Sequence, residues 1–134
     1  MKHNAWLIIN PKSGGGEALK NKKIIVDTAE GLGWKGKYCE ITAQKNGEFW
    51  VREAVKVHCK DIIVCGGDGT IREILKIVTK EKLNLGIIPI GTGNILAKNL
   101  NIPQEIHFLK CGAKHSCRMF KFFVFFFIAV NKNF

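Results

Sequence analysis

One stretch decides the fold: Ile62-Ile63-Val64-Cys65-Gly66-Gly67-Asp68-Gly69-Thr70-Ile71-Arg72-Glu73-Ile74-Leu75. Its first four residues are apolar and partly β-branched, which is typical of a strand buried on both faces of a parallel sheet. After the glycines, apolar residues recur at Ile71, Ile74, Leu75 and Val78, the spacing of one buried helical face. The stretch therefore predicts a strand that enters a helix through a glycine turn, with Thr70 as the helix N-cap.

The glycine turn is suited to binding a phosphate. Without Cβ atoms, Gly66, Gly67 and Gly69 can adopt positive φ and let an anion approach the backbone amides. The free N–H groups and the dipole of a helix start add a positive partial charge there. Asp68 is the exception, because a carboxylate repels a phosphate unless a cation or a reacting proton lies between them. This favours Mg²⁺ binding or activation of a hydroxyl, although an aspartate that only stabilises the turn fits equally well.

Composition narrows the class of protein. The chain has 134 residues, the length of one domain, and its 46% hydrophobic content suffices for an ordinary core. A formal net charge of +10 favours anionic partners such as nucleotides or an acidic membrane surface. No arginine-rich run and no interleaving of aromatic with basic residues supports nucleic-acid binding, so we expect no nucleic-acid partner.

The cysteines favour a reducing cytoplasm. There are five, an odd number, and none forms a Cys-x-x-Cys pair; we find no signal-peptide pattern either. Cys111, His115 and Cys117 could be three metal ligands, but a fourth is missing, so free thiols are favoured.

Two further strands lead into glycine-containing loops. A predicted strand at Ala5–Ile9 runs into Asn10-Pro11-Lys12-Ser13-Gly14-Gly15-Gly16, which lacks the Gly-Lys-Ser/Thr of a Walker A loop. A predicted strand at Leu85–Ile90 runs into Gly91-Thr92-Gly93-Asn94, followed by a helix at Ile95–Asn99. Each loop alone could be a simple connection between a strand and a helix.

The order of the elements predicts how the loops lie. A strand at Lys35–Ile41, closed by Thr42, and a helix at Gly47–His58 complete a repeated strand-helix pattern. This pattern predicts a parallel sheet with right-handed crossovers. Because the carboxyl ends of parallel strands share one edge, we expect the loops that begin at Asn10, Gly66 and Gly91 to face one crevice.

These loops, in this order, resemble the diacylglycerol kinase catalytic-domain family, which includes bacterial lipid kinases, sphingosine kinases and ceramide kinases. The resemblance covers about Ala5 to Pro103 and is carried by Ile9-Asn10-Pro11-Lys12-Ser13-Gly14, Gly66-Gly67-Asp68-Gly69-Thr70 and Pro89-Ile90-Gly91-Thr92-Gly93-Asn94. It implies transfer of the γ-phosphate of ATP to a lipid hydroxyl. It also implies an α/β fold, a Rossmann-like three-layer parallel sheet flanked by helices as in NAD kinases.

The resemblance also assigns residues to the nucleotide site. Asp68 would be the catalytic residue and would help to hold Mg²⁺. Arg72 stands where the family most often has Asn. The implied nucleotide-binding residues are Asn10, Pro11, Lys12, Ser13, Gly14, Thr42, Gly66, Gly67, Asp68, Gly69, Thr70, Arg72, Gly91, Thr92, Gly93 and Asn94.

The end of the chain departs from the family pattern. We expect a nucleotide-binding domain at residues 1–105, and a connector with the truncated start of a missing second, β-rich domain at residues 106–134. The run Met119–Val130 is apolar but too short to cross a bilayer as a helix. It is interpreted as the first strand of that missing domain, with an interfacial membrane anchor as the alternative.

The sequence therefore predicts an ATP- and Mg²⁺-dependent lipid kinase domain, cytoplasmic or peripheral at an anionic membrane, with diacylglycerol or a sphingoid-like lipid as the acceptor. A non-catalytic nucleotide- or membrane-binding fragment is one alternative, and a relative of the NAD kinases is another. The acceptor lipid, the activity of the short chain by itself and its assembly into a homo-oligomer stay open.

Overall fold

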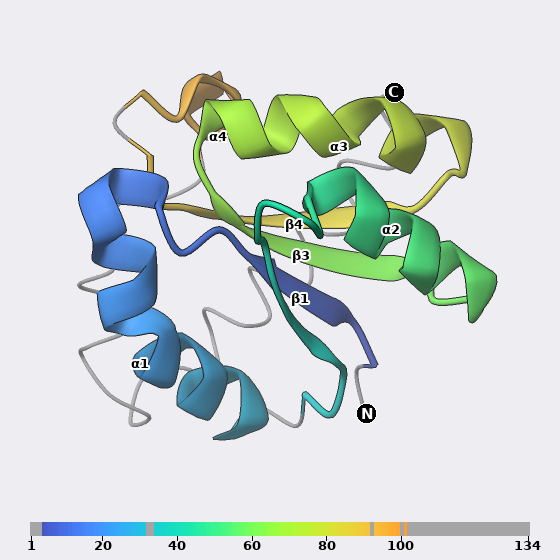
Figure 1. The fold of residues 1–134 in the computed structure, drawn as a ribbon, viewed down its shortest axis with the longest axis horizontal. Helices are drawn as coiled ribbons and strands as arrows, with labels where there is room; N and C mark the ends of the chain where they lie inside the picture. The colour runs from blue at the N-terminus through green and yellow to red at the C-terminus, as the bar shows by residue number, and fades with distance from the viewer. Residues whose placement is uncertain (1–3, 32–33, 92, 100, 102–134) are drawn as a thin grey trace.

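A parallel four-stranded sheet flanked by helices forms the frame of the molecule in the computed structural model, which describes residues 4–31, 34–91, 93–99 and 101 (Figure 1). This is the α/β architecture expected from the sequence. In chain order the elements are β1 (Trp6–Ile9), a 3₁₀ turn η1 (Ser13–Gly16), α1 (Glu17–Gly31), β2 (Tyr38–Glu40), α2 (Gly47–Lys56), β3 (Asp61–Gly66), α3 (Asp68–Lys80), β4 (Asn84–Pro89) and α4 (Ile95–Asn99).

The strand order β2-β1-β3-β4 places β3 between β1 and β4. The β1–β3 register pairs Trp6 with Ile62 and Ile9 with Cys65, and the β3–β4 register pairs Gly66 with Pro89. All pairings are parallel, so these three strands end at the same edge of the sheet. The loop that follows β3 therefore has a glycine loop on either side of it.

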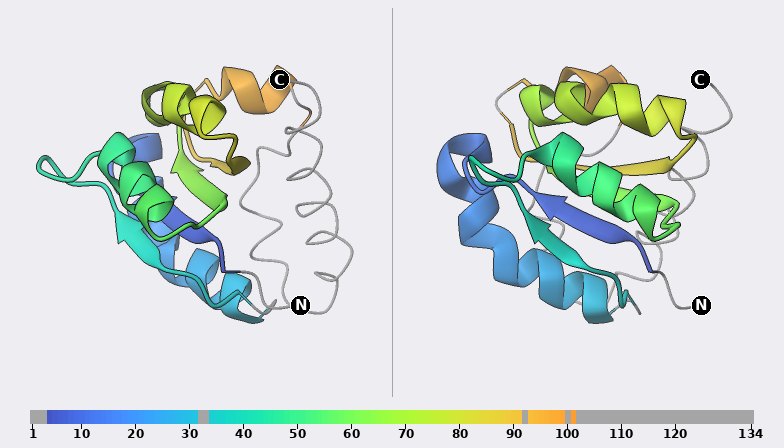
Figure 2. Two further views of the ribbon diagram at one scale, coloured as in Figure 1. Left: turned by 90° about the vertical axis from the view of Figure 1, so that its right-hand side faces the viewer. Right: turned by 45° about the vertical axis from the view of Figure 1, so that its right-hand side comes forward.

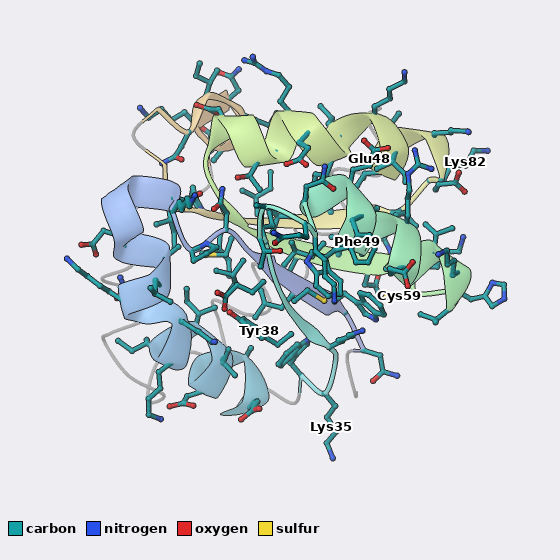
Figure 3. The ribbon with its side chains drawn as sticks, viewed as in Figure 1. Lys35, Tyr38, Glu48, Phe49, Cys59 and Lys82 are labelled. Carbon is teal, nitrogen blue, oxygen red and sulfur yellow. The ribbon has the colours of Figure 1, made fainter. Side chains whose placement is uncertain are left out.

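The helices cover both faces of the sheet and make three layers (Figure 2). Side chains alternate along β1: Trp6 and Ile8 pack in the cluster that contains the buried faces of α2 and α3, whereas Leu7 and Ile9 pack with α1. All four are buried, as the uninterrupted apolar run of a two-faced strand requires. On the α1 side, Tyr38 projects from β2 towards α1 (Figure 3), and Lys22 Nζ lies 4.4 Å from its ring centre.

The start of α3 differs from the prediction. The helix begins at Asp68, and its N-cap is Gly67, with φ −97° and ψ −169° and no side-chain cap. Thr70 as N-cap was therefore wrong, because the extended backbone at Gly67 starts the helix three residues earlier. The predicted apolar face is otherwise present, since Ile71, Ile74 and Val78 are buried.

Two other predicted elements are shorter than expected. The strand predicted over Lys35–Ile41 is paired only over Tyr38–Glu40. The helix predicted over Gly47–His58 ends at Lys56, so Val57 points outward with 61% of its surface exposed.

Several expectations concern residues outside the described part of the chain. They include the start of a second domain, the Met119–Val130 run and the candidate ligands Cys111, His115 and Cys117. Within the described residues, no helix combines the length and the apolar character needed to cross a membrane.

Candidate nucleotide-binding site

A cavity of about 520 Å³ opens where the strands end and α1 and α3 begin. The starts of α1 and α3 lie at the upper left of Figure 1. The three glycine-containing loops all contribute to its walls, so they face one crevice as their positions after parallel strands predicted. The lining consists of Asn10, Ser13, Gly14, Gly15, Gly67, Asp68, Gly69, Thr70, Glu73, Gly91 and Gly93.

The loop after β1 combines an asparagine with left-handed glycines. Asn10 Oδ1 accepts a hydrogen bond from the Lys12 amide at 3.1 Å, and Asn10 Nδ2 donates to Thr70 Oγ1 at 2.9 Å. Gly14 and Gly15 have φ of 64° and 65°, a conformation that glycine adopts without steric cost. A Cβ on Gly14 would also lie 2.4 Å from the Ile90 carbonyl oxygen. The loop therefore presents bare backbone to the cavity.

The glycines of the loop after β3 are required for a close contact between loops and not for the positive φ that the sequence suggested. Among the described glycines, positive φ occurs at Gly14, Gly15 and Gly16. Gly66, Gly67 and Gly69 therefore do not adopt the positive φ that glycine would allow there. Gly67 and Gly91 instead allow the two loops to approach closely, because a Cβ on Gly67 would lie 3.0 Å from the Gly91 Cα and a Cβ on Gly91 would lie 2.6 Å from the Gly67 Cα. The backbones of the two loops are thus in direct contact at the floor of the cavity.

Asn94 shapes the loop after β4 from within. It is 6% exposed, and its φ is 51°. Its Oδ1 accepts from the Gly91 amide and its Nδ2 donates to the Gly91 carbonyl, both at 2.8 Å. Asn94 therefore closes the loop on itself and does not line the cavity. Thr92, the other polar residue predicted here, lies outside the described residues.

Asp68 joins two loops. It is the first residue of α3, and its Oδ1 accepts a hydrogen bond of 2.7 Å from the amide of Ile95, the first residue of α4. Its Oδ2 lies beside Gly93, where a Cβ would come within 2.8 Å of it. The carboxylate thus lies at the cavity wall with one oxygen engaged by the protein.

The cavity does not include every predicted nucleotide-binding residue. Thr42 is exposed, and its Oγ1 accepts from the Lys45 amide at 3.0 Å in the turn after β2. Arg72 is exposed on α3, and Gly66 is buried against Thr70, whose Cβ would lie 2.9 Å from a Cβ on Gly66. The predicted residues outside the lining are Pro11, Lys12, Thr42, Gly66, Arg72 and Asn94.

Glu73 and Gly15 line the cavity although neither was predicted to do so. Glu73 follows Thr70 by three positions on α3, and this spacing places two residues on one helical face. That spacing from a residue of the glycine turn is the signal that could have found it. Its Oε2 lies near the first residue of α2, since a Cβ on Gly47 would be 3.3 Å away from it.

The charge of the lining is negative. It contains two carboxylates, those of Asp68 and Glu73, and no lysine or arginine among the described residues that form it. Lys35 and Lys82 extend from the ribbon before β2 and β4, at the amino ends of these strands (Figure 3). An anion in the cavity would therefore have to be held by backbone amides, hydroxyls and a cation.

The neighbouring thiol is not available as a nucleophile. Cys65, the residue before the glycine turn, is fully buried, and burial raises the pKa of its thiol to about 12. It therefore stays protonated at neutral pH, and a thiolate is the reactive form of cysteine. Covalent thiol chemistry is not what this site supports.

The described residues contain no cluster of three His, Cys, Asp or Glu side chains that could hold a metal by itself. Mg²⁺ bound with a nucleotide needs less from the protein, because it usually takes one or two carboxylates and completes its shell with phosphate oxygens and water. The cavity offers Asp68 and Glu73 for this purpose.

Comparisons with known proteins give one family. The family described as "Diacylglycerol kinase catalytic domain" matches residues 4–117. A protein of Klebsiella pneumoniae named "Probable lipid kinase YegS-like" is 37% identical over 103 residues, covering 75% of this chain and 33% of that protein. The "Diacylglycerol kinase" of Bacillus subtilis is 32% identical over 103 residues, covering 75% and 34%.

Solved structures give the same result. The crystal structure of a diacylglycerol kinase from Bacillus anthracis matches with a TM-score of 0.68 and 30% identity, covering 78% of this chain and 39% of that one. The chain thus spans about a third of the length of the curated relatives that it matches.

Proposed function

The chain belongs to the diacylglycerol kinase catalytic-domain family, and we propose that it forms the nucleotide-binding part of a lipid kinase that transfers the γ-phosphate of ATP to a lipid hydroxyl. The observation that carries this proposal is the single cavity of about 520 Å³ in which glycine loops from β1, β3 and β4 meet. We infer a lipid as the acceptor because relatives of the chain are named lipid kinase or diacylglycerol kinase.

The phosphates would bind to backbone. The amides around Ser13 to Gly15 and at the start of α3 border the cavity, and a 13-residue helix adds a partial positive charge at its N-terminus. Gly67 and Gly91, which also line the cavity, let the loops after β3 and β4 pack backbone against backbone. These features support placing the β- and γ-phosphates against the loops after β1 and β3.

Mg²⁺ would offset the negative lining. When bound with ATP it would neutralise charge on the phosphates, and Asp68 and Glu73 are the carboxylates that could hold it. Asp68 is also our candidate for the group that meets the acceptor hydroxyl, since one of its oxygens is not engaged by Ile95. Phosphoryl transfer needs little covalent chemistry from the protein, so positioning and charge neutralisation would supply most of the acceleration.

The first test is binding followed by turnover in one sample. ATP is titrated into the purified chain by calorimetry with and without Mg²⁺, and transfer from labelled ATP is then measured to vesicles that contain diacylglycerol or a sphingoid base. NAD serves as the competing acceptor. Binding that Mg²⁺ strengthens, with transfer to lipid, supports the proposal; transfer to NAD contradicts its acceptor class, and absence of ATP binding contradicts it altogether.

Asp68→Asn tests the assigned role of the carboxylate. We expect turnover to fall by about 100-fold or more, the scale of a lost general base, while ATP binding persists. Asp61→Asn is the matched control, because Asp61 is a hydrogen-bonded carboxylate at the opposite end of β3. Unchanged turnover in Asp68→Asn would remove Asp68 from the chemistry.

A further inference from the structure

The loop after β3 is held on both sides by side-chain hydrogen bonds. On one side Thr70 accepts from Asn10 of the β1 loop, and on the other Asp68 accepts from the Ile95 amide of the β4 loop. Both bonds span distant positions in the sequence and run between loops that follow neighbouring strands. The sheet sets the spacing of the strands, but these bonds set the spacing of the loops beyond it.

The Asp68 bond joins the starts of two helices. Ile95 is the first residue of α4, so its amide has no partner within the helix. Asp68 Oδ1 satisfies it at 2.7 Å from the first residue of a different helix. The bond therefore fixes the β4 loop, including the cavity residues Gly91 and Gly93, relative to the start of α3.

Gly93 is part of the same arrangement. A Cβ there would lie 2.8 Å from Asp68 Oδ2, and its next neighbours would be at 4.0 Å. Gly93 has no positive φ, so nothing but the carboxylate opposes a side chain at this position. An alanine would push the carboxylate away, at the cost of its bond to Ile95.

We propose that Asp68, spaced by Gly93, is a positioning residue that ties the β4 loop to the β3 loop and so holds the two walls of the cavity at the separation that a nucleotide phosphate requires. This role rests on the proposed function, and it is separate from the charge of Asp68. It depends on an acceptor atom at the Oδ1 position, which asparagine also provides and alanine does not.

The test compares Asp68→Asn with Asp68→Ala. Both variants lose the same negative charge, so the comparison separates the loss of the acceptor from the loss of the charge. The first measurement is hydrogen exchange of the Ile95 amide by NMR in the ligand-free chain. A lost bond to a charged acceptor predicts exchange faster by roughly 10- to 100-fold in Asp68→Ala, and by no more than about 3-fold in Asp68→Asn.

The second measurement is binding of ADP without metal, by calorimetry in a chelating buffer. Removing a carboxylate beside a phosphate site should leave Asp68→Asn binding at least as tightly as the wild type. Asp68→Ala should bind about 10-fold more weakly than Asp68→Asn, because its loops are no longer tied. Asp61→Ala removes a bonded carboxylate from the far end of β3 and should change neither measurement.

Gly93→Ala provides a variant that leaves Asp68 in place. It should speed exchange of the Ile95 amide as Asp68→Ala does, and it should have no further effect when added to Asp68→Ala, since the carboxylate it would displace is then gone. Additive effects of the two changes would contradict the arrangement.

The proposed positioning role of Asp68 is overturned if the Ile95 amide exchanges equally fast in the wild type and in Asp68→Ala, or if Asp68→Ala and Asp68→Asn bind ADP equally tightly. If the wild type binds no ADP or ATP, the proposed function fails. The exchange measurement alone then decides whether Asp68 holds the Ile95 amide in place.

Discussion

Gly91→Ala should destabilise the protein through a single backbone contact. A Cβ at this position would lie 2.6 Å from the Gly67 Cα and 2.7 Å from Asn94 Oδ1. The first of these is backbone that cannot rotate away. Carbon atoms pack at about 3.5 Å or more, so the loops after β3 and β4 would have to separate by roughly 0.9 Å.

The cost has two parts. Forcing a methyl group into a packed contact costs about 1 to 3 kcal/mol. Displacing Asn94 also weakens the two hydrogen bonds with which it closes the loop on Gly91, at about 1 kcal/mol each if they are lost. We expect the free energy of unfolding to fall by about 2 to 4 kcal/mol, which lowers the urea midpoint by roughly 1 to 2 M.

Gly69→Ala is the matched control, because Gly69 also lines the cavity. A Cβ there meets nothing within 4 Å, and Gly69 lies inside α3 without positive φ. Alanine should therefore raise the free energy of unfolding by up to about 1 kcal/mol, since it favours a helix more than glycine does. Opposite signs for the two substitutions would establish that the Gly67–Gly91 contact, and not glycine content, accounts for the effect.

The assay is urea unfolding followed by far-UV circular dichroism. If the unfolding free energies of Gly91→Ala and the wild type agree within about 0.5 kcal/mol, the size of an ordinary surface substitution, the two loops do not touch in solution. The loops after β3 and β4 would then be further apart than in the structure, and the argument that both of them contact the phosphates would fail.

Other predictions concern single bonds and one thiol. Thr70→Val keeps the shape of the side chain but removes the acceptor of Asn10 Nδ2, so urea unfolding should show a loss of about 1 kcal/mol; no loss would mean that water replaces this bond. Trp34→Phe leaves the carbonyl of Ala5 without its buried 2.6 Å donor and should cost about 1 to 3 kcal/mol in thermal unfolding, which an unchanged melting curve would contradict. Burial raises the pKa of Cys65 from an ordinary 9.0 to about 12, so above pH 9.0 the unfolded chain binds fewer protons and stability is lost as the pH rises towards 12. In urea titrations between about pH 8 and 10.5, Cys65→Ala should make this loss smaller by up to about 1.4 kcal/mol per pH unit, and parallel curves for the two proteins would refute it.

Apolar periodicity was enough to predict the frame of the fold. In the run Ile62–Cys65, Ile62, Val64 and Cys65 are buried and Ile63 is partly buried, because α2 and α3 pack on one face of the sheet and α1 on the other. A strand covered on both faces needs a continuous run of apolar residues, and a helix that packs on it needs apolar residues along one face. Parallel topology then brings the glycine loops to one edge, which is why a shared crevice could be predicted without knowing a single contact.

The direction of each side chain in that crevice could not be predicted. The helix begins at Asp68, three residues before the first helical residue that a Thr70 N-cap implies, so Asp68, Gly69 and Thr70 take helical directions that the prediction did not give them. In the structure Thr70 is buried and accepts a hydrogen bond from Asn10, Glu73 lines the cavity wall, and Arg72 is exposed. The bonds that fix these directions join residues up to 60 positions apart, beyond any local pattern.

The reason for each glycine was equally hidden. Gly14 has positive φ, whereas Gly67 has ordinary backbone and is needed because Gly91 touches it. Positive φ and a close backbone contact both require glycine, so the sequence alone cannot tell which of the two applies at a given position. The distinction matters for experiment, since alanine at Gly14 would add backbone strain to a clash with Ile90, whereas alanine at Gly67 would meet only the backbone of Gly91.

The positive charge of the chain and its candidate site are separate features. The net charge is +10, yet the cavity is lined by two carboxylates and by no basic side chain among its described residues. Surface lysines can attract an anion from a distance, but that attraction is screened beyond about 10 Å at 0.1 M salt and selects no particular ligand. Within the cavity, affinity for phosphate has to come from fixed amides and from a cation. Fixed amides are useful only if the loops that carry them are held in place, and in this protein Asn10, Asp68 and Asn94 make the side-chain bonds that do so.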